Sequence, residues 1–184
     1  MPLVLNGATS GSTTLTPTDA VTATLTLPSS TGTILTTANP QSGGVIQVVQ
    51  GTTRAFASTN SNTASSTGLS VAITPKFSNS KIFITTNFGW SCNTQDFGYF
   101  SLAPNGTSDT NTEITCFNQS STGATNSLYY ATISYLYTPA TTATQTYYLY
   151  FRCGNAPTQS MYFNGRSSGG GNGLCTITTM EIAG

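Results

Sequence analysis

The segment KIFITTNFGW, residues 81–90, decides the fold, because its apolar and polar side chains alternate with the period of a β-strand. In an extended chain the side chains on one face are those of Ile82, Ile84, Phe88 and Trp90, and those on the other are Lys81, Phe83 and Asn87. One face is therefore much richer in apolar groups than the other. This pattern predicts a strand near the centre of a sheet, with its apolar face against a core.

Segments of the same kind recur on both sides of this strand. They are residues 45–50, 69–74, 97–103, 114–118, 128–137, 145–153, 160–163 and 174–183. Turn sequences such as PNGT (104–107) and GGGNG (169–173) separate them, and no segment longer than one turn has a helical period. Many short strands between turns predict an all-β fold, a jelly-roll-like β-sandwich, for residues 44–184.

Residues 1–40 differ from the rest and predict an extended N-terminal β-arm. Within the stretch TLTLPSSTGTIL (24–35), apolar and Thr residues alternate until Pro28 and Gly32 interrupt the pattern. Two short strands about a loop are marginal on their own in water, so the arm is expected to need a partner surface. Its candidate docking residues are Val21, Leu25, Leu27, Ile34 and Leu35. The alternative is a flexible leader, since the segment is rich in Ser, Thr and Gly.

The composition limits the classes of partner. The 184 residues include five Lys or Arg and five Asp or Glu, so the formal net charge is zero. Only 5% of the residues are charged, where about 25% is usual in soluble domains. A neutral chain lacks the electrostatic attraction on which nucleic-acid binding depends. A weakly charged surface instead favours association with copies of the chain or with a larger assembly.

The sequence contains no catalytic set, so we expect a protein that is not an enzyme. Without histidine, a Ser/His/Asp or Cys/His nucleophile cannot be built in the usual way. The acidic residues Asp109 and Glu113 are close in sequence, but their segment is polar and predicts a solvated loop. The four cysteines lie far apart without a CxxC pair, so we expect buried thiols, no metal site and no cofactor. We expect no export signal and no membrane segment near the N-terminus.

The aromatic residues supply the remaining candidates. Those expected in the core or at an interface between subunits are Trp90, Tyr129, Tyr135, Tyr148 and Tyr150. Segment 145–153 has apolar groups on both faces, which predicts a sheet covered on both sides, with a symmetric partner outside. Tyr162, Asn164 and Arg166, in a strand flanked by loops, are the candidates for an exposed recognition site.

Three stretches resemble one family. They are GSTTLTP (11–17) followed by TLTLPSSTGTIL, then TPATTATQTYYLYFR (138–152), and finally LCTITTMEIAG (174–184). They are similar to bacteriophage virion surface proteins of the capsid-decoration and tail-fibre-like type, especially those of marine phages. The closing strand is the most specific of the three. The resemblance covers most of the chain, although residues 93–126 match only in the rhythm of their strands.

The resemblance implies a homotrimer on the virion, with an arm that docks on the particle and a jelly-roll knob. About forty residues of arm lead directly to the knob, without the shaft of a tail fibre. We therefore expect a capsid decoration (cement) protein that binds the major capsid protein on the outer surface of the shell and stabilises it. The alternative is a tail-fibre tip or head-fibre adhesin that binds host surface glycans.

Overall fold

The computed structural model describes residues 3–6, 12–15, 40–93, 97–107, 112–117, 127–166 and 173–184. The chain separates into two compact units, Met1–Ile34 and Leu35–Gly184. In the first unit, β1 (Leu3–Asn6) and β2 (Ser12–Leu15) form an antiparallel hairpin. The two predicted strands of the arm, on either side of Pro28 and Gly32, lie outside the described residues. The same is true of the docking candidates Val21, Leu25, Leu27, Ile34 and Leu35.

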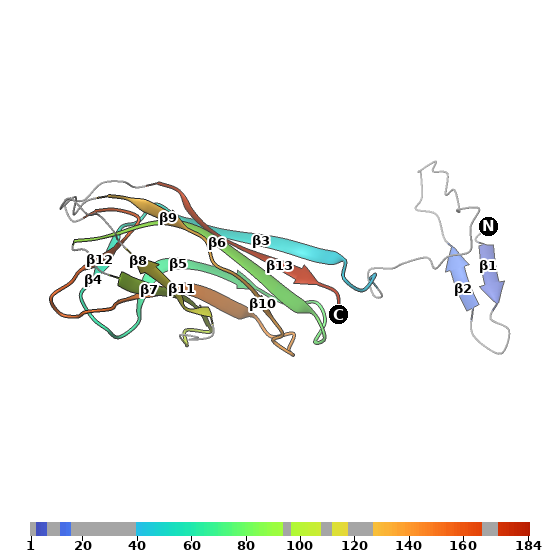
Figure 1. The fold of residues 1–184 in the computed structure, drawn as a ribbon. Coiled ribbons are helices and arrows are strands. Elements are labelled where there is room, and N and C mark those ends of the chain that lie inside the picture. Colours follow the sequence, from blue (N-terminus) through green and yellow to red (C-terminus); the bar gives the residue numbers. More distant parts are fainter. Residues whose placement is uncertain are drawn as a thin grey trace. The chain divides into compact units, whose positions relative to one another are not determined.

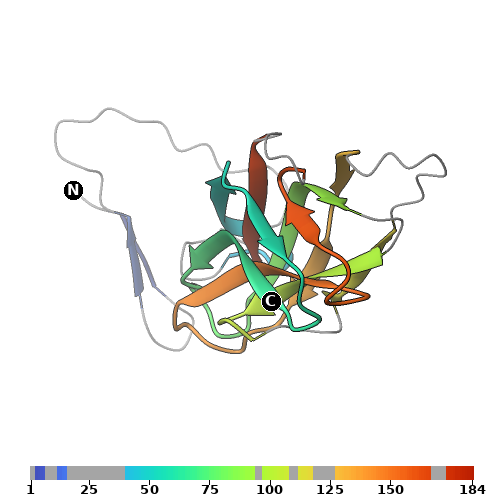
Figure 2. The same ribbon diagram turned by 90° about the vertical axis from the view of Figure 1, so that its left-hand side faces the viewer.

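The second unit is a sandwich of two antiparallel sheets (Figure 1). The strands of the seven-stranded sheet are β3 (Val45–Thr53), β4 (Ala57–Thr59), β6 (Lys81–Cys92), β9 (Tyr129–Ala131), β10 (Ser134–Tyr137), β12 (Met161–Phe163) and β13 (Cys175–Ile182). The strands of the four-stranded sheet are β5 (Ser65–Ile73), β7 (Phe97–Pro104), β8 (Ile114–Phe117) and β11 (Gln145–Cys153). Seen from the end that carries β4 and β12, the two sheets stack face to face (Figure 2).

The strand order is that of a jelly roll. One edge of β6 pairs with β13 and then β12, and its other edge pairs with β10 and then β9. Likewise β3 pairs with β13, and β4 pairs with β12. Three rows of this sheet therefore each consist of two strands in line: β3 with β4, β13 with β12, and β10 with β9. Numbered in chain order, the eight described rows are β3 with β4, β5, β6, β7, β8, β9 with β10, β11, and β12 with β13. The row order is first, eighth, third, sixth in the seven-stranded sheet and second, seventh, fourth, fifth in the four-stranded sheet. This is the double Greek key of a jelly roll, and the predicted all-β sandwich is confirmed.

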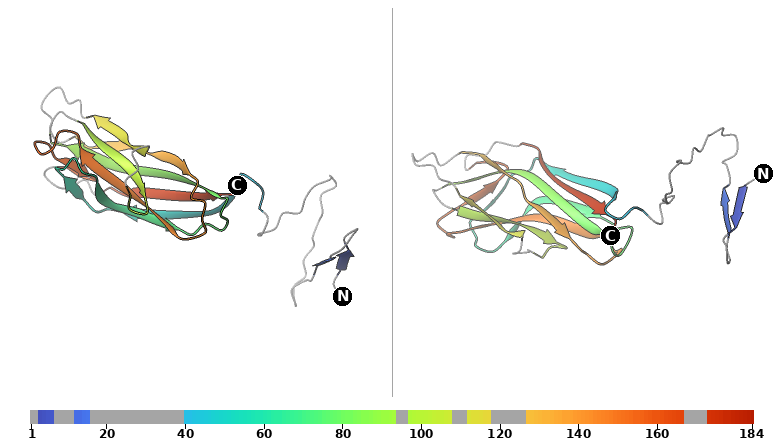
Figure 3. Two further views of the ribbon diagram at one scale, coloured as in Figure 1. Left: turned by 90° about the horizontal axis from the view of Figure 1, so that it is seen from below. Right: turned by 45° about the vertical axis from the view of Figure 1, so that its right-hand side comes forward.

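The core lies between the sheets and is built around β6. The four residues predicted on its apolar face, Ile82, Ile84, Phe88 and Trp90, are all buried. From the facing sheet, Phe100 packs against Phe88 with a distance of 4.5 Å between ring centroids, and Phe151 stacks behind it at 5.9 Å. The long strands β3, β13 and β6 lie side by side along the knob (Figure 3). The prediction of a central strand at residues 81–90 is therefore confirmed.

At one side of the sandwich the edge strands of the two sheets, β3 and β5, come close together at a glycine. A Cβ atom at Gly51 in β3 would lie 2.0 Å from the carbonyl oxygen of Ser70 in β5. The two edge strands can approach this closely because Gly51 has no side chain.

The structure departs from the sequence prediction in two rows of the seven-stranded sheet. The predicted strand at 128–137 is two strands, because the row is interrupted at residues 132 and 133. There the side chain of Thr86 replaces part of the backbone ladder, since its Oγ1 accepts a hydrogen bond from the backbone N–H of Ile133. Strand β4 was not predicted, because three residues carry too short a pattern to detect.

We predict that Phe88→Ala lowers the free energy of unfolding by about 3–5 kcal/mol, because it leaves a cavity at the centre of the core. Urea denaturation followed by far-UV circular dichroism measures the change. The matched control is Asn87→Ala, an exposed neighbour on the same strand, which should change stability by less than about 0.5 kcal/mol. Equal effects of the two substitutions would contradict the assignment of the faces of β6.

Candidate functional site

The main candidate site is a row of apolar side chains on the face of the seven-stranded sheet that points away from the core. Leu136 of β10 pairs with Phe83 of β6, Phe83 pairs with Met180 of β13, and Met180 pairs with Val48 of β3. Directly paired residues in antiparallel strands point to the same face, so the four side chains form one line across four strands. We call this set, Leu136, Phe83, Met180 and Val48, the apolar row.

The apolar row is accessible to a partner. Val48 is 56% exposed and Leu136 is 45% exposed, while Phe83 and Met180 between them are half-buried. Val45 and Ile182, which pair with each other, extend the surface, and Val45 is 59% exposed. Contiguous apolar patches of this kind on a soluble protein mark sites of association.

A row of hydroxyl and amide groups adjoins the apolar row on the same face. Gln50 Nε2 donates a hydrogen bond to Thr178 Oγ1 at 2.9 Å. Ser134 Oγ donates to Thr85 Oγ1 at 3.1 Å. The four side chains thus form two hydrogen-bonded pairs, and none of the eight residues of the two rows is charged. The surface therefore offers a partner apolar contact and neutral hydrogen-bonding groups without charge pairs.

The apolar row lies toward the end of the second unit where β6 begins and β13 ends, since Phe83 is close to the start of β6 and Met180 to the end of β13. Figure 3 shows this end beside the C-terminus. There Gly43 N donates to Ala183 O at 2.8 Å, and Ala183 N donates to Gly44 O at 2.9 Å. These bonds extend the pairing of β3 with β13 beyond the strands themselves. The beginning of the knob is thus fixed to its last strand, beside Val45 and Ile182.

A buried carboxylate holds this end of the sheet together. Glu181 lies between Met180 and Ile182 in β13, points inward and is fully buried. Its carboxylate accepts hydrogen bonds from Gln47 Nε2, Ser80 Oγ and the backbone N–H groups of Lys76 and Phe77. Burial acts to raise the pKa of Glu181, but the hydrogen bonds from Ser80, Gln47 and the two backbone groups outweigh it, so the pKa is below its ordinary value.

The outer face of the four-stranded sheet carries aromatic side chains and one ion pair. On β11, Tyr147, Leu149 and Phe151 face the core, whereas Tyr148 and Tyr150 are half-buried on the outer face, with 6.4 Å between their ring centroids. Beyond them Arg152 binds both carboxylate oxygens of Glu113, at 2.9 and 2.7 Å, and lies 3.8 Å from the ring centre of Tyr99.

The ion pair corrects one prediction and supports a structural role for this surface. Glu113 is a half-buried partner of Arg152, not part of a solvated loop, and its supposed companion Asp109 lies outside the described residues. The hydrogen bond to Glu113 raises the pKa of Arg152, which stays positively charged. Its charge is therefore largely satisfied within the chain.

The predicted core or interface aromatics fall into three environments. Trp90 is 4% exposed and belongs to the core, where Tyr129 packs on it with a centroid distance of 5.2 Å. Tyr135 is 36% exposed and contacts Tyr137 at 4.7 Å. Tyr148 and Tyr150 share the outer face described above.

The structure does not bring the predicted recognition residues together as an exposed site. Asn164 is buried, contrary to the prediction, and its side-chain amide donates to the carbonyl oxygens of Ala55 and Gly173. Its backbone has a positive φ of 53°, a conformation that asparagine tolerates better than most residues. Tyr162 is half-buried and stacks on Phe56, with 5.9 Å between centroids, and Arg166 is exposed.

The cysteines are structural. All four are free thiols and buried, as predicted. Burial, with a smaller contribution from Cys92, raises the pKa of Cys116 to about 12, so very little reactive thiolate forms at neutral pH. Within the described residues no group of three or more His, Cys, Asp or Glu is arranged to hold a metal ion. The same residues contain no helix that is long and apolar enough to cross a membrane.

Comparison of the chain with protein-family models gave no match, and comparison with curated proteins gave no match either.

The low pKa of Glu181 predicts a stability that depends on pH. A carboxyl whose pKa is lower in the folded than in the unfolded state stabilises the fold above its ordinary pKa, near 4.5. That contribution is lost as the pH falls through the folded-state pKa. We expect Glu181→Gln to be less stable than the wild type at pH 7, and the difference to shrink as the pH falls to about 3. Urea denaturation at a series of pH values measures it, and a difference that stays constant with pH would contradict the prediction.

Proposed function

We propose that this protein is a non-catalytic structural component of a virus particle, a bacteriophage capsid decoration protein that acts as a homo-oligomer. The observation that carries the proposal is the apolar row, an exposed and uncharged line of side chains across four strands. A stable monomer has no evident use for such a surface. An assembling protein has one, because burying apolar area is the main driving force of association.

The partner that best fits the apolar row is a second copy of the same chain. A charged partner would bury its own charges against the two uncharged rows, which is costly. The charged residue Lys81 lies at the margin of this face, where it is exposed and pairs with Ile182. A copy of the same two rows brings no charge, and its hydroxyl and amide groups can form neutral hydrogen bonds across the interface besides those that they form with one another. Copies around a symmetry axis can each bury this surface, and the trimer implied by the family resemblance is one such arrangement.

The role on a capsid rests on the resemblance together with this surface. The resemblance adds an N-terminal arm that docks on the major capsid protein at the outer surface of the shell. Within the knob, residues 40–44 are tied to β13 beside Val45 and Ile182, so the arm joins the knob at the end that carries the apolar row. Binding of many oligomers to the assembled shell would stabilise it by mass action, because the ligand favours the assembled state.

The first test changes the apolar row itself. Val48→Lys combined with Leu136→Lys places two charges on exposed positions, so the fold should be retained while self-association is lost. Sedimentation velocity is expected to give an oligomer for the full-length wild-type chain and a monomer for the double variant. The matched control is Ala72→Lys, an exposed position on the outer face of the four-stranded sheet, which should stay oligomeric. A monomeric wild type, or a double variant that remains oligomeric, would overturn the proposed interface.

The second test concerns the capsid. Phage particles that carry the protein are expected to release their DNA at a higher temperature than particles that lack it, because bound oligomers stabilise the shell. Release is followed with a DNA-binding dye during heating. Adding back the full-length protein should restore the higher temperature, whereas a chain without residues 1–39 should not. Equal release temperatures with and without the protein would refute a cementing role, and a few copies confined to the tail would indicate a fibre tip instead.

A further inference from the structure

Strand β10 lies at a border of the seven-stranded sheet and pairs along one edge only. Its partner is β6, and no other strand of the described part of the chain pairs with it. The opposite border of this sheet differs, because β3 lies against β5 at Gly51. A strand with an unpaired edge presents backbone N–H and C=O groups to which another strand can bond.

The hydrogen bonds of Ile133 show which backbone groups point to this free edge. Thr86 N donates to Ile133 O at 2.9 Å, and Ile133 N donates to Thr86 Oγ1 at 3.1 Å, so both backbone groups of Ile133 point toward β6. The direction alternates along an antiparallel strand, so the groups of Tyr135 point toward β6 as well. Those of Ser134 and Leu136 point away from β6, and both residues therefore present an N–H and a C=O at the free edge.

Tyr135 is accessible at the same border, although it belongs to the inner face of the sheet. It pairs with Ile84, which is fully buried, so its side chain points to the core side. Even so it is 36% exposed, with its ring against Tyr137 at a centroid distance of 4.7 Å. A strand added to β10 would cover this ring, and tyrosine is enriched at the centres of protein interfaces.

Most of the devices that protect free edges in soluble proteins are missing from this border. Charged residues, proline and bulges are such devices, and residues 127–137 contain neither a charged residue nor proline. The register on β6 is also continuous, since Ala131 lies opposite Phe88 and Ser134 lies opposite Thr85, three residues further along both strands. The remaining protection is the length of β10, four residues, which favours a short contact over open-ended stacking.

From these observations we propose that β10 pairs with β10 of a second copy, antiparallel, about a two-fold axis at Tyr135. Ser134 of each copy then lies opposite Leu136 of the other. Both are hydrogen-bonded pairs, in which the two residues exchange both N–H···O bonds, so every free N–H and C=O of these residues is used. The two Tyr135 side chains face each other at the axis as a non-hydrogen-bonded pair, the position where side chains approach most closely.

A second copy suits this edge because the contact is self-complementary and brings no charge to the axis. It is also continuous with the apolar row, since Leu136 ends that row. The sheets of the two copies become one, with both apolar rows on the same face. The edge contact goes beyond the proposed function, because it uses backbone groups and Tyr135, whereas the proposed interface buries the outer face of the sheet.

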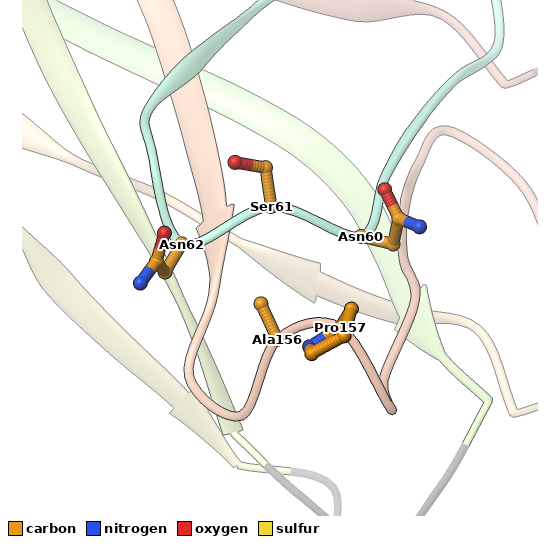
Figure 4. A pocket seen from close by; sticks show the side chains of 5 residues that line it. All are labelled: Asn60, Ser61, Asn62, Ala156 and Pro157. Atoms are coloured by element: carbon orange, nitrogen blue, oxygen red, sulfur yellow. The ribbon is translucent and has the colours of Figure 1, made fainter.

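The opposite end of the sandwich offers no comparable site. Its two loops form an open depression lined by Asn60, Ser61, Asn62, Ala156 and Pro157 (Figure 4). The carboxamides of Asn60 and Asn62 point apart, so these polar groups do not converge on one ligand (Figure 4). Strand β10 lies at the other end of the sheet (Figure 1).

Disulfide trapping of the full-length chain tests the edge contact. In Tyr135→Cys the two Cα atoms at the axis would lie about 4.5 Å apart, within the range of about 4.4–6.8 Å that a disulfide spans. Mild oxidation is expected to give a covalent dimer on a non-reducing gel, whereas the wild type stays monomeric there because its cysteines are buried. The matched control is Tyr130→Cys on β9. It is 70% exposed in the same row, so random collisions would favour it, and it should stay monomeric.

Amide hydrogen exchange gives a second measurement that needs no cysteine. The N–H groups of Ser134 and Leu136 are expected to be protected in the wild type and to lose that protection on dilution or in Tyr135→Lys. The N–H of Tyr137 bonds to β6 and should stay protected throughout.

Several results would overturn the edge contact. Trapping of Tyr130→Cys at the same rate would show random collision, and faster trapping of Leu136→Cys than of Tyr135→Cys would place the axis elsewhere. Protection of Ser134 and Leu136 that survives in Tyr135→Lys would mean that the same chain covers the edge. No protection of these amides in the undiluted wild type would leave the edge without a partner.

The substitution Val48→Lys separates this contact from the apolar row, because Val48 lies on β3 at the other border of the sheet. Trapping of Tyr135→Cys should persist when Val48→Lys is added, and its loss would overturn the edge as a separate contact. If the apolar row failed its sedimentation test while trapping persisted, the edge contact would stand without it. Leu136 belongs to both surfaces, so its substitution does not distinguish them.

Discussion

The structure depends on the pairing of β6 along both of its edges. Its twelve residues bond to β13 and β12 on one side and to β10 and β9 on the other, so one strand places four other strands, in the two rows that flank it. Its inward face supplies the centre of the core through Phe88 and Trp90. Its outward face supplies Phe83, the link between Leu136 and Met180. The register that buries the core therefore also aligns the apolar row, because a strand with period 2 fixes both faces at once.

Three of the charged residues, Glu181, Arg152 and Glu113, connect elements inside the fold, whereas Arg54, Lys76, Lys81 and Arg166 are exposed. Glu181 receives four hydrogen bonds that connect β13 to β3 and to the turn before β6. Arg152 and Glu113 connect β11 to the segment before β8 through two short bonds. Such paired charges do little to keep molecules apart in solution. With a net charge of zero, the exposed apolar row is left without an opposing electrostatic repulsion, which favours association.

The sequence predicted the architecture better than it predicted the surfaces. Alternation located the long strands, because a strand with one buried face leaves a periodic pattern; segment 145–153 matches β11 at both ends. Alternation could not reveal the apolar row, since Phe83, Met180 and Val48 are far apart in the chain and meet only through cross-strand register. It also misjudged Asn164, whose polar side chain and neighbouring loops suggested exposure. That amide is buried because it bonds two backbone carbonyls where the outer rows of the sheet are interrupted.

The interruptions of the outer rows explain why the two ends of the sandwich differ. At the end with the chain terminus, β3, β13 and β6 pair over long runs, with one register shift between Glu181 and Ile182, and their outer side chains form a continuous surface that another protein can cover. At the opposite end the rows shorten into β4, β12 and β9, and the described loops 60–64 and 154–160 connect the sheets (Figure 1). A continuous sheet face favours an extended apolar contact between proteins, whereas binding residues are commonly found on loops held by a rigid scaffold. An oligomer that buries the apolar row would therefore leave the loops at the opposite end accessible to solvent.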